Sequence, residues 1–446
     1  MTEPRYAVVG SGVSGLVAAY VLSGAGPVTV YEADARPGGH AHTHDVTLPG
    51  GQVVPVDSGF IVHNDRTYPT LCRLFSELDV ATQPTDMSMS VSGGPRRWQY
   101  AGGQGARGIL GDPRTTASPA YWRMLGEVRR FHREARNLLA HKETRGGGLD
   151  TGSASAPPYS TSSGAPPYST STDVTIGEWA GGLGFSDTFH QMFLRPLVAA
   201  VWSCDTADAL RYPARSLLTF LEHHGMLTVT GSPTWRTVVG GSRSYVDRVL
   251  KNVSEIRLSS PVREVRRTDD GVEVTDPHGT RTYAGVVIAT HPHQALRMLH
   301  RPDALEEAVL SAITYSTNLA QLHTDTSLLP TRRRVRASWN YRLPDDEQQG
   351  VLVTYDLTRL MRLPRGDEQR VLVTLNGSHR VDPSTVIAEM TYEHPLYTAE
   401  AVAAQRLLPQ LSDDRIAFAG AYHGWGFHED GAASGLAAAR RLGVSW

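Results

Sequence analysis

The chemically most informative residues are three glycines near the start of the chain. Gly10, Gly12 and Gly15 follow a short apolar segment and precede an apolar segment with helical character, in the spacing GxGxxG. Between a strand and a helix, such glycines permit a tight turn, let a pyrophosphate approach the backbone and let the two elements pack closely. Glu32 ends the next apolar segment, where a carboxylate can accept hydrogen bonds from ribose hydroxyls and would repel a 2′-phosphate. This context predicts a dinucleotide-binding βαβ unit rather than a plain glycine turn.

The residues after Glu32 distinguish between the two common dinucleotides. Arg36, Gly38 and Gly39 put a guanidinium and a second glycine turn directly after the ribose-binding carboxylate. A nicotinamide dinucleotide does not need a second glycine turn close to its phosphates. An extended FAD does, because its pyrophosphate and ribityl chain continue past the first helix. The pattern therefore favours FAD, although the same turn taken alone would also fit a glycine-rich surface loop.

The C-terminal region carries a second signal for a ligand. An apolar segment ends at Gly420, and a helix rich in small residues is expected to start at Glu429–Ala432. Small side chains at a helix start leave backbone N–H groups accessible, and these suit the pyrimidine carbonyl edge and N1 of a flavin. Such N–H groups would stabilise the charge that develops there when the flavin is reduced. The Glu429 side chain is better suited to orienting or capping than to reacting.

His428 stands directly before this helix start and has two interpretations. The imidazole pKa lies near neutrality, so a histidine beside a flavin ring could act as a general base. It could equally be a hydrogen-bonded structural residue. The sequence leaves both interpretations open.

Composition and charge argue against several other classes of protein. The chain of 446 residues is 40% hydrophobic and 20% charged, which is typical of a globular protein, and its net charge of −2 gives no electrostatic footprint for nucleic acid. Its two cysteines, Cys72 and Cys204, form no CxxC motif, and its histidines lack metal-ligand spacing, so we expect neither a disulfide scaffold nor a metal site. No apolar segment has the length of a membrane span, and Met1–Arg5 does not resemble a secretion signal, so we expect a cytoplasmic location.

The elements that must position these motifs predict an α/β fold. Strands are expected at 5–9, 28–31, 262–265, 271–274, 283–289 and 415–419, and helices at 16–22, 67–80, 120–141, 432–442 and most of 179–227. An antiparallel set of strands is expected at 319–324, 337–341, 351–355 and 371–375.

This order of elements indicates a discontinuous cofactor domain that is interrupted by a second domain. We expect a Rossmann-like FAD-binding domain at 1–85, 232–296 and 412–446, and an inserted α+β substrate domain at 86–231 and 297–411. Residues 146–172 are rich in Gly, Ser, Thr and Pro and contain the duplicated motif APPYSTS. This composition is typical of a flexible surface loop, although a proline-motif docking site also fits it.

Together these motifs resemble the flavin-containing amine oxidase superfamily, which also holds phytoene desaturases and protoporphyrinogen oxidases. The matching segments follow the superfamily's order along nearly the whole chain: Gly10–Leu16, Glu32–Gly39, Asp57–Gly59, Gly240–Gly241, Val286–Thr290 and Phe418–Ala432. The resemblance implies non-covalent FAD, with the backbone of Val262 on the adenine. The expected cofactor-binding residues are Gly10, Gly12, Ser14, Gly15, Glu32, Arg36, Gly38, Gly39, His40, Val262, Gly420, Glu429, Asp430, Gly431 and Ala432.

Finer details resemble a subgroup of bacterial NAD/FAD-binding proteins that often accompany cyclopropane fatty acid synthase-like proteins. The segments that carry this second resemblance are Gly38–Thr43, Ser338–Tyr341 and Gly424–Gly431.

The chain also departs from the superfamily's pattern. Many amine oxidases use a lysine that holds a water at flavin N5, but the two lysines here, Lys142 and Lys251, lie outside the expected region near 310–345. By the motif's spacing, His428 stands where monoamine oxidases carry an aromatic residue that faces the flavin. Large aromatic residues elsewhere are either core residues or the lining of an apolar substrate site, and the candidates are Trp202, Trp339, Tyr341 and Trp425.

We therefore expect an FAD-dependent oxidoreductase. Hydride would pass from a C–H bond of a hydrophobic or specialised-metabolite substrate to flavin N5, and oxygen or another electron acceptor would reoxidise the flavin. Two alternatives stay open: a redox-neutral FAD-dependent isomerase or cyclase, and a non-catalytic flavin-binding partner protein.

Overall fold

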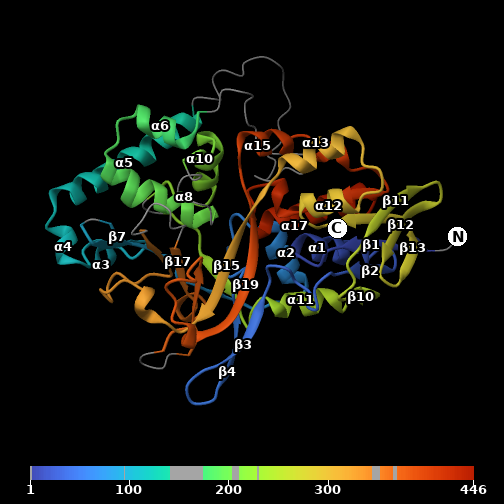
Figure 1. The fold of residues 1–446 in the computed structure, drawn as a ribbon, viewed down its shortest axis with the longest axis horizontal. Coiled ribbons are helices and arrows are strands. Elements are labelled where there is room, and N and C mark those ends of the chain that lie inside the picture. Colours follow the sequence, from blue (N-terminus) through green and yellow to red (C-terminus); the bar gives the residue numbers. More distant parts are fainter. Residues whose placement is uncertain are drawn as a thin grey trace. The chain divides into compact units, whose positions relative to one another are not determined.

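The computed structural model describes residues 3–94, 96–140, 174–202, 210–228, 231–343, 352–364 and 369–446. They belong to two compact units (Figure 1). The first unit comprises Met1–Pro84, Arg236–Tyr315 and Pro395–Trp446, and the second comprises Thr85–Trp235 and Ser316–His394. The proline-rich segment at 146–172, Lys142 and Cys204 lie outside the described residues.

A five-stranded parallel sheet forms the centre of the first unit, in the strand order β10-β2-β1-β14-β20. The strands are β1 (Tyr6–Val9), β2 (Val28–Tyr31), β10 (Glu255–Arg257), β14 (Gly285–Ile288) and β20 (Ile416–Phe418). All residues of β1, β2, β14 and β20 are buried, as in a parallel sheet covered on both faces. Because β1 lies between β2 and β14, the order of the chain reverses there, and ligands bind at such a switch point beyond the carboxyl ends of the strands.

The first unit also contains smaller sheets and helices. Three smaller sheets contain β3 (Thr43–Thr47) with β4 (Val53–Asp57), then β5 (His63–Asn64), β6 (Thr82–Pro84) and β9 (Trp235–Val238), and then β11 (Glu264–Thr268), β12 (Gly271–Asp276) and β13 (Gly279–Tyr283). The helices are α1 (Val13–Leu22), α2 (Pro69–Glu77), α11 (Arg243–Leu250), α12 (Pro292–Met298), α13 (Ala304–Ala312), α15 (Ala399–Gln405), α16 (Leu408–Leu411), η4 (Ala421–His423) and α17 (His428–Arg441).

The border between the two units differs by a few residues from the expected domain border near residues 85 and 232–235, and by more at two other places. Residues 297–315 and 395–411 are expected in the inserted domain, whereas the structure groups them with the first unit. The reason is burial: α13, α15 and α16 contribute to the same apolar core as the central sheet, through Val309, Leu310, Ala401, Ala404, Leu408 and Leu411. Helical periodicity alone does not tell which sheet a helix covers.

The second unit contains a seven-stranded sheet in the order β19-β15-β18-β17-β16-β7-β8. Its strands are β7 (Met89–Gly93), β8 (Trp98–Gly102), β15 (Tyr315–His323), β16 (Trp339–Arg342), β17 (Leu352–Asp356), β18 (Leu372–Leu375) and β19 (Val386–Pro395). The expected antiparallel set corresponds to β15–β18, and the pairing of β16 with β7 is parallel. The helices are α3 (Ala106–Ile109), α4 (Pro113–Thr116), α5 (Pro119–Ala140), α6 (Ile176–Gly182), α7 (Asp187–Phe189), η1 (His190–Leu194), α8 (Arg195–Trp202), α10 (Ala214–His223), η2 (Thr326–Leu328), α14 (Leu357–Leu360) and η3 (Pro383–Thr385). None of the described helices combines the length and apolar composition that a membrane crossing requires.

Close packing of α1 against α17 joins the two ends of the chain in the first unit (Figure 1). A Cβ atom on Gly435 of α17 would lie only 2.1 Å from the backbone oxygen of Ser14 in α1. A Cβ on Gly431 would lie 2.6 Å from Cγ1 of Val13. Glycine at these positions lets the N-terminal half of α17 lie beside the first turn of α1.

We predict that Gly435→Ala destabilises the protein by more than about 2 kcal/mol, because the new methyl group meets backbone that cannot move independently of α1. Gly126→Ala is the matched control: Gly126 lies within α5, and a Cβ there meets nothing within 4 Å. This control should stabilise the protein by about 0.5–1 kcal/mol, since alanine is the better helix former. Chemical denaturation of both variants measures the difference, and equal stabilities would contradict the packing argument.

Candidate functional site

Ser11 joins the first glycine turn to the carboxylate that follows β2. Its backbone N–H donates to Oε2 of Glu32 at 3.0 Å, and its hydroxyl donates to the same oxygen. The other carboxylate oxygen, Oε1, accepts from the backbone N–H of Asp34 at 2.9 Å. Three donors therefore fix the Glu32 carboxylate beside the start of α1, and its binding of ribose stays a prediction.

The second glycine turn is connected to the same serine. The N–H of Gly38 donates to Oγ of Ser11 at 3.0 Å, and Nη2 of Arg36 donates to the Gly39 carbonyl at 2.8 Å. Gly38 and Gly39 have φ values of +111° and +55°, which favour glycine. A Cβ on Gly39 would lie 3.2 Å from Cα of Gly12. The two turns predicted to hold one FAD thus lie against each other.

The glycines of the first turn have different reasons to be glycine. A Cβ on Gly10 would lie 2.6 Å from the Ala289 oxygen, and one on Gly15 would lie 1.9 Å from the Gly10 oxygen. Gly12 differs, because a Cβ there meets nothing within 4 Å and its φ of −62° and ψ of 174° suit any residue. The protein itself does not require glycine at position 12. The open space beside this backbone fits the approach of a pyrophosphate at the N-terminus of α1.

The adenine end also fits a dinucleotide. Ser260 donates its N–H to the Glu32 carbonyl at 2.8 Å, which holds the segment before β11 next to Glu32. Val262 follows in this segment, and within the described part of the chain no hydrogen bond uses its backbone groups. They are free for the adenine contact predicted for Val262.

Several predicted C-terminal residues have packing roles in the structure. A Cβ on Gly420 would lie 2.1 Å from Cε1 of Tyr422, and the Gly420 N–H donates to Oγ of Ser434 at 2.9 Å. Ser14 and Ala432 are buried along α1 and α17. These contacts fix the loop before α17, while direct contact of these residues with FAD stays a prediction.

The side chains of Glu429 and Asp430 both point back into the protein. Glu429 accepts the N–H groups of Thr70 and Leu71 at 2.9 and 3.0 Å, so it caps the N-terminus of α2. Both N–H groups lie in the first turn of α2, where they have no intrahelical partner, and Pro69, the residue before them, has no N–H. Asp430 accepts the N–H of Phe427 at 2.9 Å. Burial raises the pKa of both carboxyls to about 7, and any contact of these residues with FAD must come from their backbone.

His428 is held from two sides. Its Nε2 lies 2.8 Å from the hydroxyl of Tyr245, and its ring stacks on Phe60 with centroids 3.6 Å apart and an interplanar angle of 4°. Burial, with a smaller effect from His63, lowers the pKa of His428 to about 3. A histidine with this pKa is a weak base at neutral pH, so the geometry favours the structural interpretation, and the catalytic role stays a prediction.

The four aromatic candidates for substrate contact are packed within their own units. Trp202 contacts Tyr212 and Phe220 with centroids 5.5 and 4.8 Å apart, and Trp339 contacts Tyr355 at 5.2 Å. Tyr341 and Trp425 are buried. Core packing therefore accounts for these side chains, and their role in substrate binding stays a prediction.

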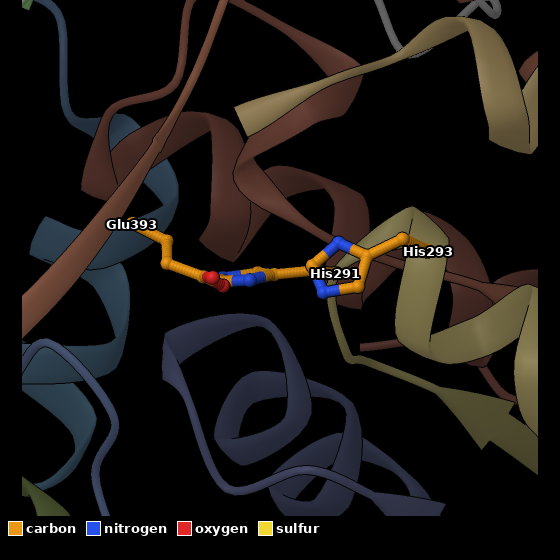
Figure 2. Close-up of side chains that lie close together, drawn as sticks. All are labelled: His291, His293 and Glu393. Carbon is orange, nitrogen blue, oxygen red and sulfur yellow. The ribbon is translucent and has the colours of Figure 1, made fainter. Parts of the chain in front are cut away.

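Other histidines lie near the second glycine turn and at the start of α12. The His40 carbonyl accepts the Phe60 N–H at 2.7 Å, and contact of His40 with the cofactor stays a prediction. The rings of His42 and His44 lie 4.1 Å apart, and burial, together with the charge of Arg36, lowers the pKa of His42 to about 3. Figure 2 shows His291 and His293, whose rings lie 5.8 Å apart, and also Glu393, which belongs to the second unit.

The family model for flavin containing amine oxidoreductases matches residues 13–443. The chain belongs to this family. Its membership confirms the predicted superfamily, the flavin cofactor and the oxidoreductase class. The proposed subgroup and the substrate are finer points that the family does not decide.

Solved structures confirm the predicted fold class. Cyclohexylamine oxidase from Brevibacterium oxydans IH-35A is 16% identical, with 98% of each chain covered and a TM-score of 0.66. The CLA-producing fatty acid isomerase from P. acnes is 14% identical, with 98% of this chain and 97% of that chain covered and a TM-score of 0.67. These likenesses concern the fold alone. The L-amino-acid oxidase of Daboia russelii is 60% identical over 45 residues, which are 10% of this chain and 9% of that protein.

Sequence reasoning missed the residues that orient the predicted ones. Ser11 lies inside the first motif, so a hydroxyl between two motif glycines was an available signal. Phe60, Tyr245 and Thr70 are distant from His428 and Glu429 in sequence, and no spacing rule connects them.

We predict that Glu429→Gln destabilises the protein and that the effect depends on pH. Because the folded-state pKa of Glu429 is raised from 4.5 to about 7, its contribution is full below about pH 4.5 and is lost as the pH rises through about 7. The glutamine cannot titrate and can accept only through one oxygen. We expect a loss of about 1–3 kcal/mol at pH 5, from one unpaired buried N–H, and a smaller loss at pH 8.

The measurement is urea denaturation of the wild type and the variant at both pH values. Glu134→Gln is the control, since Glu134 pairs with the neighbouring Arg133 on the surface of α5. A difference between wild type and Glu429→Gln that grows from pH 5 to pH 8 would contradict the assignment.

Proposed function

We propose that this chain is an FAD-dependent oxidoreductase that takes a hydride from a C–H bond of a hydrophobic or specialised-metabolite substrate. The observation that carries the proposal is the open backbone at Gly12, facing Gly39 and next to the fixed Glu32 carboxylate. When bound, FAD supplies the hydride acceptor, and oxygen or another acceptor takes the electrons afterwards.

The chain's own residues would bind and orient this cofactor. Glu32 would accept hydrogen bonds from ribose hydroxyls, and the N–H groups at the start of α1 would bind the pyrophosphate. The N–H groups in the first turn of α17 would face the pyrimidine edge, where their partial positive charge stabilises negative charge. Glu429 accepts from α2 and Asp430 accepts from Phe427, and these hydrogen bonds would hold the start of α17 in position.

The preference for a hydrophobic substrate over a simple primary amine rests on the lysines. Lys251 is an exposed residue just after α11, so it is a poor candidate for a lysine that holds a water beside the flavin. The segments Gly38–Thr43, Ser338–Tyr341 and Gly424–Gly431 support a place in the subgroup that accompanies cyclopropane fatty acid synthase-like proteins. We propose a lipid-like substrate on this basis.

A redox-neutral isomerase is the second candidate. The observation that favours it is the shared fold with a protein described as a fatty acid isomerase, at a TM-score of 0.67 over 98% of this chain. The oxidoreductase and the isomerase differ in whether the substrate is oxidised overall.

We predict that Gly12→Ala leaves the fold of the apoprotein unchanged and weakens FAD binding at least tenfold. The methyl group meets no protein atom within 4 Å, but it occupies the space that a pyrophosphate needs. FAD titration by fluorescence and thermal unfolding of the apoprotein measure the two effects. Gly181→Ala is the control, since a Cβ there also meets nothing within 4 Å. Unchanged FAD affinity in Gly12→Ala would contradict the assignment of this turn to the FAD pyrophosphate.

We further predict that the reconstituted holoprotein is bleached at the flavin absorption band when it is mixed with its substrate without oxygen. Long-chain unsaturated and methyl-branched fatty acids and their esters are the first candidates, with primary amines as the comparison class. Bleaching followed by return of colour in air supports net oxidation. A changed product with no net loss of electrons from the substrate supports the isomerase, and bleaching only by amines would overturn the hydrophobic-substrate proposal.

A further inference from the structure

We propose that Tyr245 fixes His428 as a neutral hydrogen-bond donor, whose Nδ1–H is offered to the bound flavin, rather than as a general base. This inference rests on the proposed FAD site and adds two residues to it. Three observations support it: Nε2 of His428 lies within hydrogen-bond distance of Tyr245, Phe60 stacks on the imidazole, and Nδ1 of His428 is accessible.

The direction of the hydrogen bond follows from the surroundings of Tyr245. Its side chain is fully buried, and within the described part of the chain its hydroxyl has one hydrogen-bond partner, Nε2 of His428 at 2.8 Å. If Nε2 carried the hydrogen, the Tyr245 hydroxyl hydrogen would have no acceptor, at a cost of about 1–3 kcal/mol. The hydroxyl therefore donates and Nε2 accepts.

The charge states agree with this direction. Burial raises the pKa of Tyr245 far above its usual value, so the hydroxyl keeps its proton. The lowered pKa of His428 leaves the imidazole with a single proton at neutral pH. Because Nε2 accepts from Tyr245, that proton is on Nδ1.

The ring is also fixed against rotation. Phe60 covers one face of His428 at 3.6 Å, and the N–H of Phe60 donates to the His40 carbonyl at 2.7 Å, next to the second glycine turn. Tyr245 comes from α11 and is itself packed on Phe75 of α2, with centroids 5.3 Å apart. His428 is thus held between Phe60, which is hydrogen-bonded to the residue after the second glycine turn, and Tyr245 of α11.

The remaining nitrogen is accessible. His428 is partly exposed, and among the described residues nothing accepts a hydrogen bond from its Nδ1. The nearby titratable groups do not change this: His63 of β5 is buried, its pKa is lowered to about 4, and it is neutral, while Asp57 of β4 acts on Tyr245. His428 is the first residue of α17, so its free N–H lies at the same helix start as the backbone donors.

A neutral donor has a different consequence from a base. It stabilises negative charge on the reduced flavin without taking up a proton, so its contribution is constant between about pH 5 and 8. A general base would instead titrate with the reaction and add a limb to the pH profile. Tyr245 acts through His428 and is a positioning residue.

The first test uses the wild-type holoprotein with isotope-labelled histidine. We expect the nitrogen shifts of His428 to report the Nδ1–H tautomer from pH 5 to 8, with no titration. An Nε2–H tautomer, or a histidine that titrates near pH 6.5, would overturn the proposal, whether or not any variant folds.

The second test measures the flavin midpoint potential in Tyr245→Phe and His428→Asn, with Tyr20→Phe as the control. Tyr245→Phe keeps the ring and removes the hydroxyl that fixes the imidazole, and Tyr20 loses only a hydroxyl that bonds Glu77 on an exposed surface. We expect the reduced flavin to be about tenfold less favoured in Tyr245→Phe, or about 30 mV for a two-electron couple, with most of the potential retained in His428→Asn because its amide still donates.

An unchanged potential in Tyr245→Phe would overturn the donor role. The failure of the FAD site itself would look different, because the wild-type protein would then retain no flavin and no potential could be measured. A protein that holds FAD and has a titrating His428 would keep the proposed function and lose only this inference.

Discussion

The close backbone approach between α1 and α17 is the constraint on which the cofactor site depends. Gly435 allows the Ser14 carbonyl, from the opposite end of the chain, to lie where a side chain would otherwise be. Both helices begin at the carboxyl edge of the same parallel sheet, α1 after β1 and α17 after β20 and η4. Their N-termini, where the first N–H groups of a helix have no intrahelical partner, therefore meet at one place. A larger residue at the crossing would separate the two halves of the proposed FAD site.

Buried carboxylates hold the helices around this crossing. Asp57 accepts the N–H of Ser242 at the start of α11, Glu429 caps α2, and Asp430 accepts the N–H of Phe427 before α17. In each case burial raises the pKa, so desolvation outweighs the helix N-terminus, which favours the anion. The three carboxyls act as hydrogen-bond acceptors that connect separate segments, and their charge is secondary.

The sequence was most informative where a function is local and periodic. The strand–turn–helix pattern around Gly10–Gly15, the carboxylate at Glu32 and the second turn at Gly38–Gly39 are contiguous motifs, and the structure brings them together through Ser11. It was least informative where a role depends on a partner that is distant in the chain. The pairing of Glu429 with α2 arises from the packing of α17 on α2, and His428 reaches Tyr245 of α11 only in the folded chain. Neither residue type nor spacing predicts these pairs. The bounds of the two compact units differ from the expected domain bounds for a related reason, because α13 and α15 have apolar faces that fit either unit until the core is known.

The electrostatics of the site follow from these partners. His42, His63 and His428 all have pKa values lowered by burial, and Asp57, Glu429 and Asp430 have values raised by it. Opposite shifts in acids and bases leave this region with less side-chain charge than its composition suggests. Beside the Glu32 carboxylate and the Arg36 guanidinium, the backbone N–H groups at the starts of α1 and α17 are a fixed source of field, because the fold sets their orientation and they do not titrate. A flavin held there would gain a negative charge on reduction next to dipoles that need no rearrangement, which is the condition under which such dipoles stabilise charge best. The motif glycines would therefore have two roles. They leave space for the cofactor, and they bring the N–H dipoles close enough to act on it.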